Sequence, residues 1–260
     1  MKKKLGFALG AGGSRGIAHI GFLKAMEEEG IKPDYIAGCS MGSIVGGAYA
    51  AGVSVEVMEQ AVRKLKLLQL LSGGNRPGGL FETKKIRKIL SQYIGDLEFS
   101  DLKTPFRCVA VDLYTQSIVE FSEGSVIDGV VASSSIPGVF KPTEKNGMLL
   151  VDGGLLARVP CEFVKNMGAD IVVAVDVLGN LATLEKKPST ITVLLESYNI
   201  MDNYRTAIRR KEQESIIDFW LEPSLGSMNQ YSLKQLEFAL EEGYKLGKAN
   251  AQKIKDALGK

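Results

Sequence analysis

Hydrophobic positions along the chain follow two patterns, and each predicts a different kind of element. Short runs rich in β-branched and aromatic residues predict strands, and apolar positions at helical spacing predict helices. The predicted strands are 4–9, 34–38, 106–111, 117–121, 148–151, 170–176 and 217–221. The predicted helices are 17–29, 41–51, 55–71, 83–94, 157–167 and 232–257. Alternating strands and helices predict an α/β fold, with a mostly parallel central sheet flanked by helices on both faces in three layers.

Two stretches resemble a signal peptide or a membrane-spanning helix, but their details argue against both. The start, MKKKLGFALGAGG, imitates a signal peptide, but its apolar run 5–9 is too short for the hydrophobic part of one. Residues 35–55 carry no charge and could span a bilayer by length, yet their five glycines and three serines favour a buried strand, turn and helix. The segments 72–79 and 179–190 predict polar, flexible loops.

Composition narrows the class of protein. With 260 residues, 45% hydrophobic and 24% charged, the chain is typical of a soluble globular protein, and we expect a single domain over 1–260 with a helical segment, 190–260, packed on it. A formal net charge of +2 gives no field that would favour nucleic acid. Cys39, Cys108 and Cys161 lack zinc or disulfide spacing, which favours a cytoplasmic location.

The glycine-rich stretch GAGGSRG, residues 10–16, follows a predicted strand and precedes a helix. Its backbone N–H groups and the helix N-terminus could therefore hold negative charge. As a dinucleotide fingerprint it is incomplete, because Arg15 stands where glycine is required and Asp34 precedes its strand instead of ending it. The glycines could also serve only the geometry of a tight turn.

The stretch Gly38-Cys39-Ser40-Met41-Gly42 matches GxSxG. An apolar run precedes it and a helix of small residues follows, which is the strand-turn-helix context of a nucleophile elbow. The pattern predicts a nucleophilic Ser40, and the alternative is a serine that caps a helix N-terminus. Cys39 is expected to be a small buried filler, since nothing nearby marks it as a reactive thiolate.

A serine nucleophile needs a base, and the chain has one histidine, His19. It precedes the serine and lies at helical spacing, whereas α/β-hydrolases order their triad as serine, acid, histidine, so a packed histidine is expected. The base is then a carboxylate, a lysine or a terminal amine. Asp152 is the best candidate, because it ends a predicted strand and precedes two glycines. An ordinary Asp-Gly turn would look the same, and Asp112 and Asp176 also follow strands.

Three segments together resemble the patatin-like phospholipase family, in particular its compact bacterial members. They are a glycine-rich oxyanion loop, the GxSxG motif and a D-G-G motif, and here they read Gly12-Gly13-Ser14-Arg15-Gly16, Gly38-Cys39-Ser40-Met41-Gly42 and Asp152-Gly153-Gly154. The segment 132–142, ASSSIPGVFKP, is similar to the family block before that aspartate. Order and spacing agree over 5–176, although Ala11 stands where many members have another glycine.

The resemblance implies a serine hydrolase of lipid acyl esters that uses a Ser40–Asp152 dyad and needs no cofactor or metal. It also implies that the backbone N–H groups of the loop stabilise the oxyanion and that further glycines support the motifs. The implied donors are Gly12, Gly13, Ser14 and Arg15, and the supporting residues are Gly16, Gly38, Gly42, Gly153 and Gly154. The Arg15 side chain could pair with a carboxylate or attract a lipid phosphate, or only its backbone could act.

The sequence says less about the substrate, membrane contact and oligomeric state. A lipid or another acyl ester is the expected substrate, and peripheral membrane contact and a homo-oligomer stay open. The leucines of 65–71, with Leu80 and Phe81, could line an acyl channel or touch a bilayer, although leucines at helical spacing usually face a core. Helix 232–257 could form a surface or a dimer contact. The alternative functions are a non-catalytic regulatory or binding protein that retains the fold, and a nucleotide-binding α/β protein.

Overall fold

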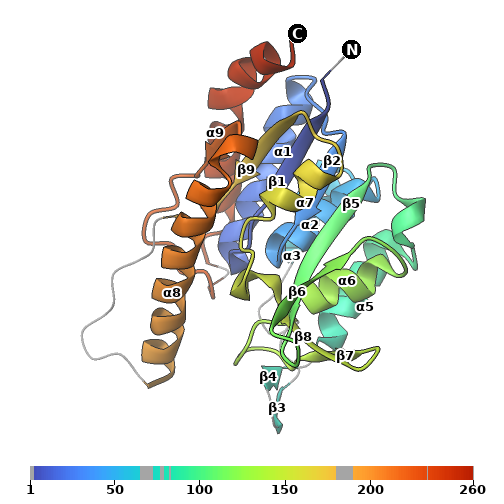
Figure 1. Cartoon of the computed structure of the whole chain (residues 1–260), viewed down its shortest axis with the longest axis vertical. Helices are drawn as coiled ribbons and strands as arrows, with labels where there is room; N and C mark the ends of the chain where they lie inside the picture. Colours follow the sequence, from blue (N-terminus) through green and yellow to red (C-terminus); the bar gives the residue numbers. More distant parts are fainter. Residues whose placement is uncertain are drawn as a thin grey trace.

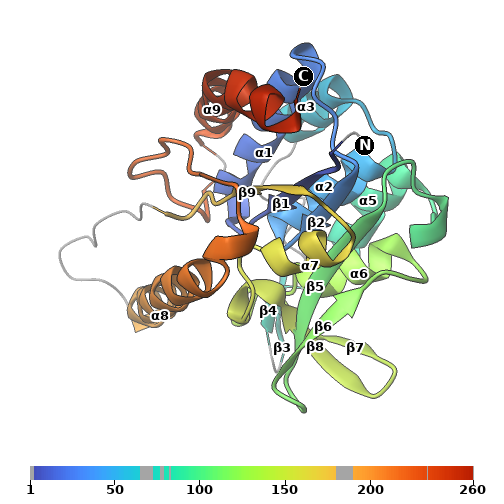
Figure 2. The ribbon, with the colours of Figure 1, turned by 45° about the horizontal axis from the view of Figure 1, so that its top comes forward.

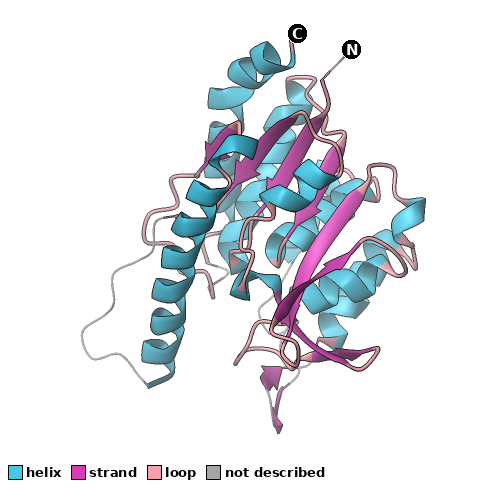
Figure 3. Cartoon of the chain, viewed as in Figure 1, coloured by secondary structure: helices cyan, strands magenta, loops and turns pink. Residues whose placement is uncertain are grey.

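The computed structural model describes residues 3–64, 73–76, 79–81, 83–179, 190–232 and 234–259. At its centre, these residues form an eight-stranded sheet in the order β10-β9-β1-β2-β5-β8-β7, with β6 paired to β5 (Figures 1 and 3). The strands are β1 (Leu5–Leu9), β2 (Tyr35–Gly38), β5 (Phe106–Asp112), β6 (Ser117–Phe121), β7 (Thr143–Lys145), β8 (Met148–Asp152), β9 (Ile171–Val175) and β10 (Phe219–Leu221). Strands β10, β9, β1, β2 and β5 are parallel, and β6, β7 and β8 add antiparallel pairs.

Helices cover both faces of the sheet, as the sequence predicts (Figures 1 and 2). One face carries α1 (Ala18–Glu28), α2 (Met41–Ala50), α3 (Val55–Lys64), α5 (Lys84–Ile94), α6 (Val126–Ser133) and α9 (Leu236–Leu258), whose apolar side chains share one core with the sheet. The other face carries α7 (Cys161–Asn166), and α8 (Thr190–Glu212) lies at the edge of that side (Figure 2). The expected three-layer α/β architecture is confirmed.

The alternation of side chains along β1 explains why the two faces differ. Leu5, Phe7 and Leu9 enter the larger core, whereas Ala8 faces the smaller core under α7. A Cβ on Gly6 would lie 2.7 Å from the Val164 side chain, so the small residues of this face let α7 approach closely. Both faces of the strand are apolar, which is typical of a parallel strand between two helical layers.

All seven predicted strands are present within one or two residues. Residues 35–55 form β2, a tight turn and α2, and no helix among the described residues combines the length and the apolar character that a bilayer crossing requires. Where the pattern predicts a flexible loop over 72–79, the described residues form the short antiparallel pair β3 (Gly73–Arg76) and β4 (Gly79–Phe81). The leucines of 65–71 lie outside the described residues.

The helix predictions differ in places. The helix predicted over 157–167 begins only at Cys161, because Pro160 precedes its first turn and Arg158 is used elsewhere. The pattern gave no bounds for α8, although 190–260 is expected to be helical, and it missed α6 entirely. Both α8 and α6 contribute to the candidate site.

Candidate active site

Ser40 lies in the sharp turn between β2 and α2. Its backbone adopts φ 54° and ψ −122°, a conformation that costs a non-glycine residue about 1–3 kcal/mol. The turn closes because Gly42 packs against the end of β1, where a Cβ would lie 2.1 Å from the Leu9 carbonyl oxygen. The Ser40 side chain makes no capping hydrogen bond to α2. The strained turn therefore matches a nucleophile elbow and not an N-cap.

Strand β5 explains how Asp152 reaches this turn from 112 positions along the chain. Cys108 on β5 pairs with Gly38 of β2 on one side and with β6 on the other. Ala110 also pairs with β6, and its partner on the opposite side is Asp152 of β8, in antiparallel register. Strands β2 and β8 therefore lie on the same side of β5 and point toward each other. Their carboxyl ends meet two residues apart, where Ser40 begins α2.

The carboxylate of Asp152 is buried and faces the serine. Ser40 and Asp152 are only 3% and 4% exposed, and the Ser40 hydroxyl lies close enough to the carboxylate to lower its pKa. Oδ1 also accepts from the backbone N–H of Gly154 at 2.8 Å and lies 3.8 Å from Cys39 Sγ. Burial raises the pKa of Asp152 to about 6, against the hydrogen bonds that lower it, and the charge of Asp202 acts in the same direction as burial. This carboxylate is thus a better base than an ordinary aspartate.

Two serines at the end of α6 hold the strained turn, and the sequence analysis gave them no role. The Ser40 N–H donates to Ser133 Oγ at 3.0 Å, and Ser134 Oγ donates to the Ser40 carbonyl at 3.3 Å. Ser135 accepts the Asp152 N–H through its carbonyl at 3.0 Å. The sequence feature that could have revealed these residues is the run of three serines, SSS, within 132–142. This one segment contacts the backbone of both Ser40 and Asp152.

The glycine-rich loop lies beside the elbow. A Cβ on Gly16 would sit 2.6 Å from the Met41 side chain, next to Ser40. Gly13 has φ 51°, and a Cβ there would lie 2.4 Å from the Gln230 carbonyl oxygen, so glycine is required. The other supporting glycines pack equally closely, since a Cβ on Gly12, Gly38, Gly153 or Gly154 would lie 2.2, 2.6, 2.3 or 3.0 Å from a neighbouring atom.

The N–H groups of this loop are not all available. The Ser14 N–H donates to the Gln230 carbonyl at 2.9 Å, and the Arg15 N–H donates to the Gly12 carbonyl at 3.1 Å. Among the residues that the structure describes, nothing accepts a hydrogen bond from the N–H of Gly12 or Gly13. A phosphate cradle would need the whole series of N–H groups, so the loop fits a small oxyanion better than a nucleotide.

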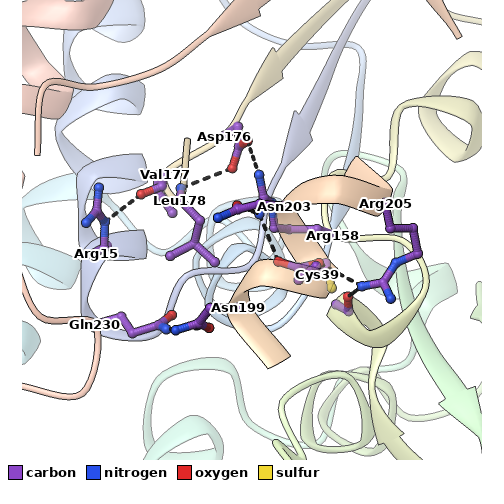
Figure 4. Close-up of polar contacts among 12 residues, drawn as sticks. Arg15, Cys39, Arg158, Asp176, Val177, Leu178, Asn199, Asn203, Arg205 and Gln230 are labelled. Carbon is purple, nitrogen blue, oxygen red and sulfur yellow. Dashed lines mark hydrogen bonds and ion pairs between the residues drawn. The ribbon is translucent and has the colours of Figure 1, made fainter. Parts of the chain in front are cut away.

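Arg15 and His19 are structural. The Arg15 guanidinium is 1% exposed and donates to the Val177 carbonyl (Figure 4). It also donates to the carbonyls of Gly226 and Met228, which ties the loop to a second segment. It is too deeply buried to meet a lipid phosphate. His19 is also buried, with Nε2 2.8 Å from the Gly10 carbonyl, and burial lowers its pKa to about 4. The expectation of a packed histidine is confirmed.

The two other strand-end aspartates serve the fold. Asp112 accepts hydrogen bonds from the Thr115 hydroxyl and from backbone N–H groups of the β5–β6 turn, and also from the Leu149 N–H of β8. Asp176 accepts from Arg158 Nη2 at 2.6 Å and from the Leu178 N–H at 3.0 Å (Figure 4). Of the three candidate aspartates, Asp152 is the one whose carboxylate lies beside the Ser40 hydroxyl.

Helix α8 packs its polar side against the segment Asp152-Gly153-Gly154. Arg205 donates to the Gly154 carbonyl at 2.9 Å and to Asp202 at 2.8 Å (Figure 4). Arg158 lies between Asp202 and Asp176, and all three side chains are at most 5% exposed. This buried ionic network fixes α8 beside Ser40 and Asp152. It also places the charge of Asp202 where it helps to raise the pKa of Asp152.

Comparison with known proteins finds a matching family model and several sequence relatives. The family model described as patatin-like phospholipase matches residues 7–165, within the stretch 5–176 over which the sequence resembles that family. An uncharacterized NTE family protein of Mycobacterium bovis is 36% identical over 181 residues, which cover 69% of this chain and 50% of that protein. The lysophospholipase nte1 of Emericella nidulans is 31% identical over 67% of this chain and 12% of its own length. The chain thus spans half or less of these relatives.

Solved structures share the fold at low sequence identity. VipD from Legionella pneumophila superimposes with a TM-score of 0.68 at 13% identity, over 97% of this chain and 67% of that one. The type III effector protein ExoU gives a TM-score of 0.52 at 13% identity, over 96% and 53% of the two chains. These similarities confirm the α/β architecture.

Proposed function

Since this chain belongs to the patatin-like phospholipase family, we propose that it is a serine hydrolase of lipid acyl esters that uses a Ser40–Asp152 dyad. One observation carries the proposal: a serine in a strained turn places its hydroxyl beside a buried carboxylate, whose pKa it lowers. The conserved chemistry of serine hydrolases requires a base within hydrogen-bond reach of the nucleophile, and here no imidazole stands between them.

In the proposed mechanism, Ser40 Oγ attacks the ester carbonyl carbon while Asp152 accepts the hydroxyl proton. The tetrahedral intermediate collapses to an acyl-Ser40, and the leaving alcohol takes the proton back from Asp152. Water, activated by the same carboxylate, then releases the fatty acid. A pKa near 6 matches this alternation, because the carboxylate is ionised at neutral pH yet accepts a proton more readily than an ordinary aspartate does.

The oxyanion would be stabilised by the glycine-rich loop. The sequence predicts Gly12, Gly13, Ser14 and Arg15 as donors, and the engaged N–H groups of Ser14 and Arg15 favour Gly12 and Gly13 for this role. Removing one such donor typically costs roughly 3–4 kcal/mol of transition-state stabilisation. Preorganisation by buried Arg15 and by Gln230 would keep the loop fixed during the reaction.

The substrate class is inferred from the relatives. Two of these relatives are named as a neuropathy target esterase and a lysophospholipase, and they are 32% and 31% identical to this chain over the matched residues. A lipid acyl ester therefore fits the site best, with phospholipids and lysophospholipids as the first candidates. The nucleotide-binding alternative loses support because two loop N–H groups and the Arg15 guanidinium already bind protein carbonyls.

Labelling with a fluorophosphonate tests the proposal. We expect one adduct, on Ser40, and turnover of lysophospholipid that both Ser40→Ala and Asp152→Asn abolish. Ser91→Ala, on a serine of α5 whose hydroxyl bonds only its own helix, is the matched control and should react like the parent chain. If the folded protein carries no adduct on Ser40, and if Ser40→Ala keeps its full biological effect, the non-catalytic regulatory or binding function is supported instead.

A further inference from the structure

Helix α8 has its polar side inward and its apolar side outward, the reverse of an ordinary surface helix. Inward, Asn199, Asp202 and Thr206 are buried. Outward, one stripe at helical spacing holds six large apolar residues that are 41–72% exposed, namely Val193, Leu194, Ile200, Met201, Tyr204 and Ile208. We call these six residues the α8 stripe.

The inward contacts fix this orientation of α8. Arg158 joins Asp202 at 2.8 Å in a fully buried ion pair, and Arg205 donates to the Gly154 carbonyl at 2.9 Å. Asn199 accepts from Gln230 at 3.1 Å (Figure 4). Turning the helix to hide its stripe would break these bonds and leave buried charges unpaired, which is strongly unfavourable. Among the described residues, the stripe therefore has no cover from its own chain.

The size of the stripe suits a protein partner. Its six side chains expose on the order of 600 Å² together, at the upper limit for an apolar patch on a monomer and near the roughly 800 Å² that each partner buries in a standard interface. Within the part of the chain that the structure describes, α8 lies at the edge of the molecule with its outer side uncovered (Figures 1 and 2). A straight helix of 23 residues can pack along its whole length against another helix.

Charge around the stripe favours a second copy over a lipid surface. Helices that lie on membranes carry free basic residues beside their apolar side, which attract anionic lipid. Here Arg205, Arg209 and Arg210 are paired with Asp202, Glu162 and Glu222, which leaves Lys211, at the C-terminal end of the stripe, as the basic side chain of α8 without an ion pair among the described residues. The stripe itself has no charged side chain, so two copies can bring it together without desolvating any ion.

We propose that the α8 stripe is the interface of a two-fold homodimer, formed by packing α8 against α8 of a second copy. A self-complementary patch is what a two-fold interface needs, because each residue contacts the same surface on the partner. The middle of the stripe, Ile200 and Met201, would lie next to the axis. Because the inner side of α8 holds the Asp152 loop, dimer contact would also keep that helix in place beside the active site. This proposal does not depend on catalysis.

Light scattering after size-exclusion chromatography tests the oligomeric state. The full chain should elute at twice its mass of 28.1 kDa, and Leu194→Glu and Met201→Glu should each raise the dissociation constant at least about 100-fold, because two carboxylates per dimer would be desolvated. The matched control is Tyr114→Glu, which changes a 70% exposed residue in the β5–β6 turn and should leave the dimer intact. Far-ultraviolet circular dichroism and fluorophosphonate labelling verify folding separately.

Cross-linking tests the geometry. Met201→Cys should join two chains through a short bis-maleimide, whereas Tyr114→Cys should not, and the native Cys39, Cys108 and Cys161 are too buried to compete. A parent chain that stays monomeric up to about 100 μM would overturn the proposal. So would a dimer that survives both glutamate substitutions. Monomers that bind phosphatidylcholine vesicles and lose this binding in Met201→Glu would show that lipid, not a second copy, covers the stripe.

Discussion

Replacing Asp152 with asparagine should stabilise the fold while it removes the base. Burial raises the pKa of this carboxyl from 3.8 to about 6, so the folded chain binds the proton more tightly than the unfolded chain does. Between these two values folding stability falls as pH rises, because ionisation is less costly in the unfolded chain. At about 1.4 kcal/mol per pH unit, the ionised carboxylate costs ~3 kcal/mol above pH 7. Asparagine cannot ionise, and its oxygen can still accept the Gly154 N–H.

Urea unfolding from pH 4 to pH 8 measures this effect. Asp152→Asn should match the parent chain near pH 4, gain stability through pH 6 and keep a ~3 kcal/mol advantage at pH 8. Asp112→Asn is the control of opposite sign. Burial tends to raise the pKa of Asp112, but hydrogen bonds from Thr115 and backbone N–H groups hold it below its usual value. That variant should lose stability at pH 8 and recover it on acidification. A gain in Asp152→Asn that is independent of pH, or a loss at pH 8, would refute the reasoning.

Four further outcomes are expected. The acidic limb of the kcat/KM profile for ester hydrolysis should fall through a pKa of about 6, because protonated Asp152 cannot act as base. Ser40→Gly should be ~1–3 kcal/mol more stable than Ser40→Ala in urea unfolding, since glycine relieves the strained φ of 54°. Arg158→Met should cost about 3–5 kcal/mol in the same assay, because it leaves two buried aspartates without their partner. Gly42→Ala should destabilise the fold by at least ~2 kcal/mol and abolish labelling of Ser40, because the added Cβ would meet the Leu9 carbonyl at 2.1 Å.

Local chemistry explains which parts of the site the sequence could predict. A nucleophile elbow is built from consecutive residues, so GxSxG between a strand and a helix specifies the turn at Ser40 on its own. The glycines of these motifs can be predicted for the same reason, since a close approach of two backbone segments leaves no space for a side chain. The single histidine also disfavours an α/β-hydrolase triad, because it precedes the serine. These conclusions need only neighbours along the chain.

Helix α8 shows why a periodic pattern can fail. Its apolar residues repeat at helical spacing, but they face outward, and its inner side is held by an ion pair to Arg158 and by a hydrogen bond to the Gly154 carbonyl. Pattern analysis assigns apolar residues to the core, so it gives α8 neither bounds nor a role. The serines that end α6 were missed because a hydrogen bond to Ser40 leaves no mark on local propensity.

The sequence by itself determined the strands, the elbow and the residue types that the chemistry needs, because these follow from short-range backbone and hydrophobic preferences. The local sequence only ranked Asp152 first among three strand-end acids, and the tertiary structure shows which of them lies beside the serine. Asp112, Asp152 and Asp176 all end strands, and the choice depends on β8 returning antiparallel along β5 until its last residue faces the end of β2. Burial at that junction also sets the pKa of the carboxylate, and burial is a property of the packed chain rather than of any segment of it.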